Sequence, residues 1–258
     1  MLLTGRIYAR DVQRCVLSGR ALPSVLELAH PVLEYLKLPP LQAAKLDSTL
    51  PASAVTYEFS ARRDDRGGKA LIESWGKTDW HGSGVICLRR LEGQDVLGCR
   101  YDQPYFVGSV AGRPVCCARL TLDRRDCRTR ILELQSLRPE MTELMIEAVV
   151  HEIASNAQSG PMTVVIDIRA DIPQLQASLE GLGFFPTAYY PALVASGSER
   201  VDAVQYTRLL NLTFADSLKM VRDLDWPPAM ELLSQVTRSA QGAPPSILSG
   251  EERKVSTE

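Results

Sequence analysis

The amino-acid sequence predicts an α/β fold, in which a mixed, mostly antiparallel sheet is flanked by helices and preceded by an enlarged N-terminal part. Three observations predict it. Between residues 54 and 137, short apolar runs alternate with turn residues at the spacing of an antiparallel meander. From residue 139 the apolar spacing becomes that of a helix. The run TVVIDIRA that follows is rich in β-branched residues, which is typical of a buried parallel strand.

The bulk composition is that of a globular protein. The chain has 258 residues, of which 45% are hydrophobic and 23% charged, with a net charge of −2. This balance argues against a nucleic-acid partner or a membrane-surface partner. The stretch MLLTGRIYARD contains no long apolar run, so we predict no signal peptide, no membrane span and a cytoplasmic location. Six cysteines without C-x-x-C spacing and only three histidines indicate free thiols and no metal site.

The N-terminal part is predicted to combine helices with hairpins. Residues 9–37 read as helical, with a first amphipathic set over 12–17 and a second helix after Pro23, in which we expect a kink or break at Pro31. Residues 54–102 predict two hairpins, the first with the turn RRDDRGG and the second with the turn EGQD. These hairpins fit either an insertion or a degenerate first half of a tandem protein.

The second half of the chain alternates strands and helices in a regular order. A third hairpin, PYFVGSV and PVCCARLTL, precedes the strand TRILELQSL. The helices PEMTELMIEAVVHEIASNA and IPQLQASLEGLGF flank the buried strand, and the strands FFPTAYYPALV and RVDAVQYTRLL close the series. We therefore divide the chain into an N-terminal part (1–103), a core (104–212), C-terminal helices (213–240) and a disordered tail (241–258).

Three stretches of this core carry a family resemblance: FVGSVAGRPVCCARL, ILELQSL and PQLQASLEGLGFFP. In this order they resemble the second and third strands, the fourth strand and the last helix of the GNAT acyltransferase family. In the turn Leu182-Gly183-Phe184, we expect the glycine to end the helix in a left-handed conformation and Phe184 to pack beneath the sheet.

The resemblance implies a co-substrate, acyl-CoA or a phosphopantetheine thioester, held between the fourth and fifth strands by strand amides. The residues expected to bind it are Leu134, Gln135, Ser136, Leu137, Arg138 and Thr142. The family's glycine-rich pyrophosphate loop is missing, because the corresponding stretch SLRPEMTE has no glycine and carries Glu140 and Glu143. An acyl carrier protein is therefore a possible partner, since its donor group has no 3′-phospho-ADP to bind.

The resemblance also implies an acid and a base for catalysis. Tyr189 and Tyr190 are candidates for the acid, and Glu133 on the fourth strand is the candidate base. Because side chains alternate along a strand, one tyrosine should face the cleft and the other the opposite side.

Several more polar residues and the paired cysteines are predicted to be structural. Asp167 and Arg169 share a strand face and are expected to form an ion pair or a substrate contact. Asp202 is expected to be a turn carboxylate, with a contact to Arg200 or to a substrate amine as the alternatives. Cys116 and Cys117 lie among apolar neighbours, which predicts inert packing.

The predicted function is transfer of an acyl group from a thioester donor to an amine or hydroxyl of a small-molecule acceptor, by direct attack. A catalytically degenerate GNAT-like module for binding or assembly is a second hypothesis. An aminoacyl-tRNA-dependent transferase, or a thioester hydrolase or decarboxylase, could be built on the same scaffold and is the third.

Overall fold

The structure is a computed structural model that describes residues 13–14, 20–44, 58–75, 102–123, 127–156, 162–196 and 199–211. The predicted hairpin around the turn EGQD lies outside the described residues. So do the predicted C-terminal helices over 213–240 and the predicted tail over 241–258.

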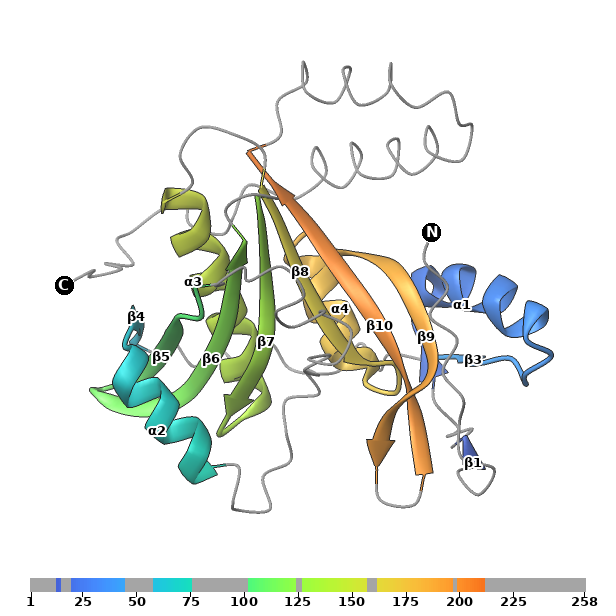
Figure 1. Ribbon diagram of the computed structural model, residues 1–258, viewed down its shortest axis with the longest axis horizontal. Helices are drawn as coiled ribbons and strands as arrows, with labels where there is room; N and C mark the ends of the chain where they lie inside the picture. Colours follow the sequence, from blue (N-terminus) through green and yellow to red (C-terminus); the bar gives the residue numbers. More distant parts are fainter. Residues whose placement is uncertain are drawn as a thin grey trace.

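Eight of the described strands form one sheet (Figure 1). Its strands are β1 (Gln13–Arg14), β4 (Phe59–Arg63), β5 (Tyr105–Val110), β6 (Arg113–Asp123), β7 (Arg128–Ser136), β8 (Met162–Arg169), β9 (Phe185–Ser196) and β10 (Glu199–Leu210). From β4 to β8 they are adjacent in chain order, and β10 then lies between β8 and β9. Pairing is parallel between β7 and β8 and between β1 and β10, and antiparallel elsewhere. The predicted mixed, mostly antiparallel sheet is confirmed.

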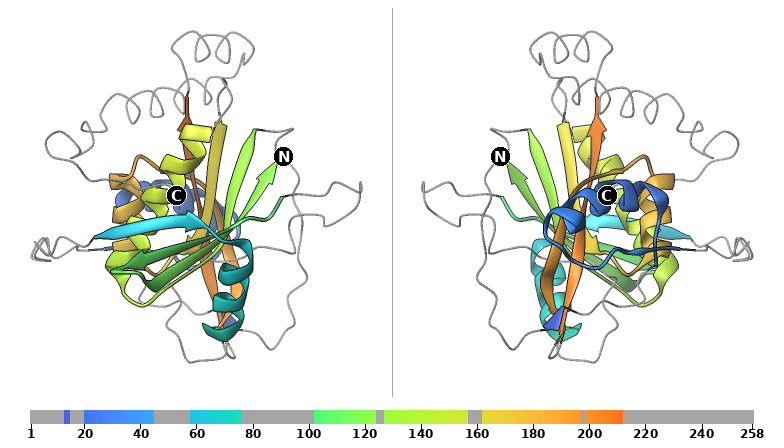
Figure 2. Two further views of the ribbon diagram at one scale, coloured as in Figure 1. Left: turned by 90° about the vertical axis from the view of Figure 1, so that its left-hand side faces the viewer. Right: turned by 90° about the vertical axis from the view of Figure 1, so that its right-hand side faces the viewer.

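Helices cover both faces of this sheet. α1 (Pro23–Tyr35), α3 (Pro139–Asn156) and α4 (Pro173–Gly181) contribute to the main hydrophobic core, while α2 (Asp65–Trp75) packs on a smaller cluster with Val107 and Cys117. Figure 2 shows α2 and α3 on opposite sides of the sheet. A short parallel pair, β2 (Arg20–Ala21) and β3 (Gln42–Ala43), brackets α1.

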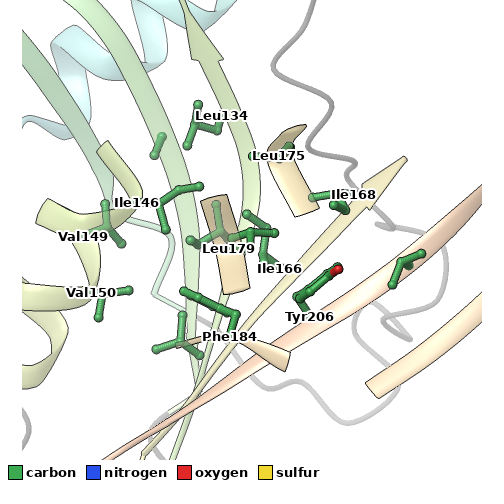
Figure 3. Close-up of a cluster of buried hydrophobic side chains, with 14 of the residues drawn as sticks. Leu134, Ile146, Val149, Val150, Ile166, Ile168, Leu175, Leu179, Phe184 and Tyr206 are labelled. Carbon is green, nitrogen blue, oxygen red and sulfur yellow. The ribbon is translucent and has the colours of Figure 1, made fainter. Parts of the chain in front are cut away.

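Alternation along the strands separates two faces. Cys116 belongs to the main core and its neighbour Cys117 to the cluster under α2, so successive side chains of β6 point to opposite faces. We call the face that carries the main core the core face (Figure 3). On it, apolar side chains of β7, β8 and β10 meet those of α3 and α4. The residues labelled there are Leu134, Ile146, Val149, Val150, Ile166, Ile168, Leu175, Leu179, Phe184 and Tyr206.

Two N-terminal predictions were wrong in detail, and one of the two alternatives at Pro31 is excluded. The segment predicted as the second strand of the first hairpin is part of the helix α2. Asp64 lies just before this helix and accepts a hydrogen bond from the Gly67 amide (2.7 Å), as an N-cap residue does. Residues 13–14 form a strand, although helix was expected there. Pro31 does not break α1, which continues to Tyr35.

The end of α4 forms as expected at the Leu-Gly-Phe turn. Gly183 has a φ of +78°, its amide donates to the Glu180 carbonyl (2.9 Å), and the Phe184 amide donates to the Leu179 carbonyl (2.9 Å). This pair of bonds is the Schellman motif, which requires a left-handed residue and so favours glycine. It turns the chain so that Phe184, which is buried, packs with Leu179 under the sheet (Figure 3).

A buried glutamine attaches the start of α1 to α4 and to the end of β8. The side-chain oxygen of Gln176 accepts from the Leu22 amide (3.0 Å), and its nitrogen donates to the Ala170 carbonyl (2.8 Å). Because both ends of the amide are satisfied, the fully buried Gln176 fixes the N-terminal helix on the core face.

The last strand pair is irregular. β9 contains Pro186 and Pro191, and Ala192 has a positive φ of 50°. The β9–β10 register shifts between Val201 and Ala203. β9 is thus bent close to its two adjacent tyrosines, Tyr189 and Tyr190.

Candidate functional site

The parallel strands β7 and β8 separate halfway along their length. Their pairing ends at Ile131 and Ile166, whereas β7 continues to Ser136 and β8 to Arg169. Glu133 pairs with Arg119 and Ile131 with Leu120 of β6, so β7 has an extra residue at this point, Leu132. Such a bulge bends its strand. Figure 1 shows the two strands close together at one end and apart at the other.

Backbone groups of β7 alternate in direction beyond the bulge. The Leu137 amide donates to the Val115 carbonyl (2.9 Å), on the β6 side. By alternation, the backbone groups of Leu134 and Ser136 point toward the β8 side, where the strands separate. The Leu134 side chain lies in the core, while Leu137, at 48% exposure, and Arg138 are exposed.

The first turn of α3 follows directly and is held by side chains. The hydroxyls of Ser136 and Thr142 lie 2.6 Å apart and are buried. Glu140 is exposed in the first turn, and Glu143 accepts a hydrogen bond from the Ser178 hydroxyl of α4 (3.1 Å). The helix start is therefore ordered by its own residues and carries acidic side chains that oppose anion binding.

The face of the sheet opposite the core face carries a row of polar side chains, and we call it the polar face. It includes Arg119, Thr121, Arg128, Arg130, Glu133, Gln135, Asp167, Tyr190 and Gln205. On β6 and β7, Arg119 lies 3.2 Å from the Glu133 carboxylate, and Gln135 donates to the same carboxylate (3.0 Å). The Glu133 side chain is 27% exposed, so it is the more accessible member of this ion pair.

A second ion pair lies on β7 and β8. Arg130 Nη1 is 3.2 Å from Asp167 Oδ2, and the Gln205 side chain donates to Asp167 Oδ1 (3.0 Å). Asp167 is completely buried. Both of its oxygens accept hydrogen bonds, which is how a buried carboxylate stays ionised.

The two adjacent tyrosines of β9 point to opposite faces, as predicted. Tyr190 is half-buried on the polar face. Burial and the Asp167 carboxylate raise the pKa of Tyr190, while Arg130 and Arg128 offset part of that rise. Tyr189 is buried in the main core and donates its hydroxyl to the Asp202 carboxylate, which also accepts from the Ala192 amide (2.7 Å). The structure thus brings Tyr190, but not Tyr189, to the face that carries Glu133.

Two predicted roles need correction. In place of the expected mutual pair, Asp167 binds Arg130, and Arg169 binds Asp171 (2.6 Å) on the adjoining turn. Asp202 is not a turn carboxylate, since it is 5% exposed and holds the bend of β9.

Sequence reasoning also missed Arg119, Arg130 and Gln205. The alternation of side chains along a strand predicts which face each of them occupies. Their interaction partners can be inferred only from the order of the strands in the sheet, which places β10 beside β8.

The paired cysteines are packed in the interior, as predicted. Burial raises the pKa of the Cys116 and Cys117 thiols to about 12. Within the described ranges, no three His, Cys, Asp or Glu side chains cluster in a way that could hold a metal ion. No helix of the described part has the length and apolar character that crossing a bilayer requires.

The sheet order and the separated strands together decide the fold. Three antiparallel strands lead through α3 to a parallel strand, and α4 then leads to an antiparallel pair whose last strand inserts beside β8. The fold is GNAT-like. This GNAT-like arrangement also includes β4, which extends the sheet beyond β5, and it places the separation between the fourth and fifth strands of the series β4 to β8.

Comparisons with known proteins extend only to structure. No family model and no curated protein matches the chain. It is similar to the ribosomal-protein-S18-alanine N-acetyltransferase from Escherichia coli (13% identity, TM-score 0.43), covering 60% of this chain and 96% of that one. It is also similar to an IAA acetyltransferase from Bacillus cereus (12% identity, TM-score 0.41), covering 59% of this chain and 99% of that one. A third similar structure is a mutant spermidine N-acetyltransferase from Vibrio cholerae (11% identity, TM-score 0.44), covering 59% of this chain and 94% of that one. At these identities the similarity concerns the fold alone.

Proposed function

We propose that the protein is an acyltransferase that moves an acyl group from a thioester donor to an amine or hydroxyl of a small molecule. The observation that carries this proposal is the separation of β7 and β8 after Leu132, with Tyr190 and Glu133 on the adjoining polar face. A pantetheine arm lying along β7 would meet the backbone groups of Leu134 and Ser136. Its thioester would then lie within reach of the polar face.

The chemistry needs a proton acceptor and a proton donor. The acceptor nitrogen or oxygen attacks the thioester carbonyl carbon, the C–S bond breaks, and the departing sulfur takes up a proton. We assign that proton to Tyr190, because it is the tyrosine of β9 whose phenol lies on the polar face. We assign to Glu133 the proton that the acceptor loses, because its carboxylate lies on the polar face, 3.2 Å from Arg119, and its side chain remains partly exposed.

The start of α3 favours a donor that is recognised through its pantetheine arm. Glu140 places negative charge at the helix N-terminus, and the Thr142 hydroxyl is bonded to Ser136. Neither feature supports a pyrophosphate. We therefore propose a phosphopantetheine thioester, presented by an acyl carrier protein, or an acyl-CoA whose nucleotide adds little to binding.

Calorimetry with the full chain tests this function. The probes are acetyl-CoA and S-acetyl-phosphopantetheine, which differ only in the nucleotide. Similar dissociation constants support recognition of the arm. Binding of acetyl-CoA that is stronger by about two orders of magnitude or more (roughly 2.7 kcal/mol) would show that the nucleotide is held. If neither probe binds, the acyltransferase function is rejected and a binding module becomes the better account.

A further inference from the structure

One cation of the polar face is not used by the two ion pairs. Arg128, half-buried at the start of β7, makes no ion pair or side-chain hydrogen bond with any residue that the structure describes. The Arg119–Glu133 and Arg130–Asp167 pairs each balance their own charges. Arg128 therefore holds a guanidinium on this face that those two pairs do not use. Its cross-strand neighbour on the same face is Asp123.

A buried hydroxyl lies beside this cation. Thr121 of β6 is only 6% exposed, and its Oγ1 has no hydrogen-bond partner among the residues described. Buried polar atoms are nearly always satisfied by protein, water or ligand, so an unsatisfied one on a functional face indicates a missing partner. A second buried polar atom without a hydrogen-bond partner in the described part of the chain lies further along the same face. It is the Oε1 atom of Gln135.

The sheet register places these groups beside one another on the polar face. Thr121 lies opposite Arg130, and Arg128 lies two residues before Arg130 on the same strand face. Directly opposed side chains have Cβ atoms about 5 Å apart, and diagonal neighbours about 7–8 Å. The phenol of Tyr190 lies close enough to Arg128 and Arg130 to be influenced by the charges of both. The cation and the unsatisfied hydroxyl thus lie side by side, and Thr121 is two residues along β6 from Arg119, the partner of Glu133.

We propose that Arg128 and Thr121 bind a carboxylate of the acceptor, so that the acceptor is an amine or hydroxyl compound that also carries a carboxylate, as amino acids do. This inference rests on the proposed function and names its acceptor class. A guanidinium and a hydroxyl both donate hydrogen bonds to a carboxylate.

The test compares acceptors that differ only in the carboxylate. Calorimetry and acetyl transfer are measured for the full chain with L-leucine and isopentylamine, L-phenylalanine and phenethylamine, and L-lysine and cadaverine, within a panel of all twenty L-amino acids. The donors are acetyl-CoA and S-acetyl-phosphopantetheine. We expect at least one amino acid to bind about tenfold or more tightly than its amine, as the loss of a charge-assisted bond requires.

Two variants locate the effect. Arg128→Gln and Thr121→Val should each weaken binding of the amino acid about tenfold or more and leave donor binding unchanged. Thr121→Val should not destabilise the protein, because its hydroxyl makes no hydrogen bond with the described residues. Thr129→Val is the matched control. Thr129 is equally buried on β7 but lies on the core face, where its hydroxyl contacts Met162 Sδ (3.8 Å), so the variant should bind both ligands normally.

The outcomes separate this inference from the proposed function. If the donors bind but amines match or exceed their amino acids, or if Arg128→Gln binds amino acids normally, the carboxylate site is rejected and the acyltransferase stands. If amino acids bind through Arg128 while neither donor binds, the carboxylate site is supported and the acyltransferase is rejected. If no member of the panel binds or is acetylated, the carboxylate site is rejected.

Discussion

Arg130 and Asp167 form a buried ion pair at the middle of the polar face, with 3.2 Å between Nη1 and Oδ2. Their side chains are 9% and 0% exposed, and Gln205 donates to the second carboxylate oxygen. The pair joins β7 to β8 beside the point where these strands separate. It therefore fixes the spacing of the two strands on the side where the proposed donor lies.

Removal of one partner of this pair should strongly destabilise the fold. We expect Arg130→Met to lower the free energy of unfolding by about 3–5 kcal/mol, because it leaves the buried Asp167 carboxylate without its cation. Urea denaturation followed by circular dichroism measures this change. Arg130→Met combined with Asp167→Leu should recover much of the loss, since no uncompensated charge remains.

The more exposed pair of Arg169 and Asp171 supplies the control. Their side chains are 34% and 15% exposed, so Arg169→Met should cost no more than about 1 kcal/mol. Equal effects of the two arginine substitutions would contradict the role assigned to burial.

The two tyrosines of β9 should separate catalysis from stability. Tyr190→Phe removes the proposed acid and should lower kcat about 10²-fold or more with little change in stability. Tyr189→Phe should leave the chemistry intact but destabilise by about 1–3 kcal/mol, because the Asp202 carboxylate loses its phenol donor in the core.

Both variants are compared by steady-state kinetics with the donor that calorimetry selects and by urea denaturation. A Tyr190→Phe variant with normal turnover would remove Tyr190 from the mechanism. Glu133→Gln, assayed in parallel, tests the proposed base in the same way.

The glycine pair at the end of α4 should respond in opposite directions. Gly183→Ala should destabilise by about 1–2 kcal/mol, because φ is +78° and a left-handed alanine is strained. Gly181→Ala should be neutral or stabilise by up to about 1 kcal/mol, since Gly181 is helical and an added Cβ would meet no atom within 4 Å. Thermal unfolding of the two variants measures both changes, and destabilisation of equal size would argue against the Schellman turn.

The cysteines should differ sharply in reactivity. Cys116 and Cys117 have thiol pKa values raised from 9.0 to about 12, whereas Cys127 is exposed. At pH 8 we therefore expect iodoacetamide to modify Cys127 and to spare both buried thiols until denaturant is added, as peptide mass spectrometry would show. Modification of Cys116 or Cys117 in the folded protein at the rate of Cys127 would contradict their burial.

The same thiols make stability depend on alkaline pH. A pKa that is higher in the folded state means that folding favours the protonated thiol. The contribution of these thiols to the free energy of unfolding is therefore complete below about pH 9 and decreases as the pH rises toward 12. Denaturation midpoints measured from pH 8 to pH 11 should fall, and Cys117→Ala should reduce that fall.

The sequence predicted the second half of the fold well because its signals are local and strong. α3 is long and periodic, β8 is a β-branched run, and α4 ends on a glycine turn. The helix α2 was missed because a short apolar run fits both the spacing of a helix and the alternation of a strand. Its two glycines suggested a hairpin turn, yet Gly68 lies inside the helix, where a Cβ would meet the Tyr105 side chain at 2.5 Å.

The candidate site was predicted only where one strand determines it. Alternation placed Tyr189 and Tyr190 on opposite faces, which the structure confirms, but it could not tell which of them faces Glu133. Arg130 meets Asp167 across a parallel pair whose members are separated by α3, and Gln205 reaches Asp167 because β10 inserts beside β8. Such contacts depend on topology, which no local pattern records.

The prolines and the left-handed residue of β9 have a consequence for association between copies of the chain. A strand at the margin of a sheet invites another chain to continue the hydrogen-bonded ladder. β9 lies at such a margin in the described part of the sheet, but Pro186 and Pro191 supply no N–H, and Ala192 breaks the extended backbone. β9 is therefore a poor template for domain swapping or fibril growth, even though it places a tyrosine in the proposed site.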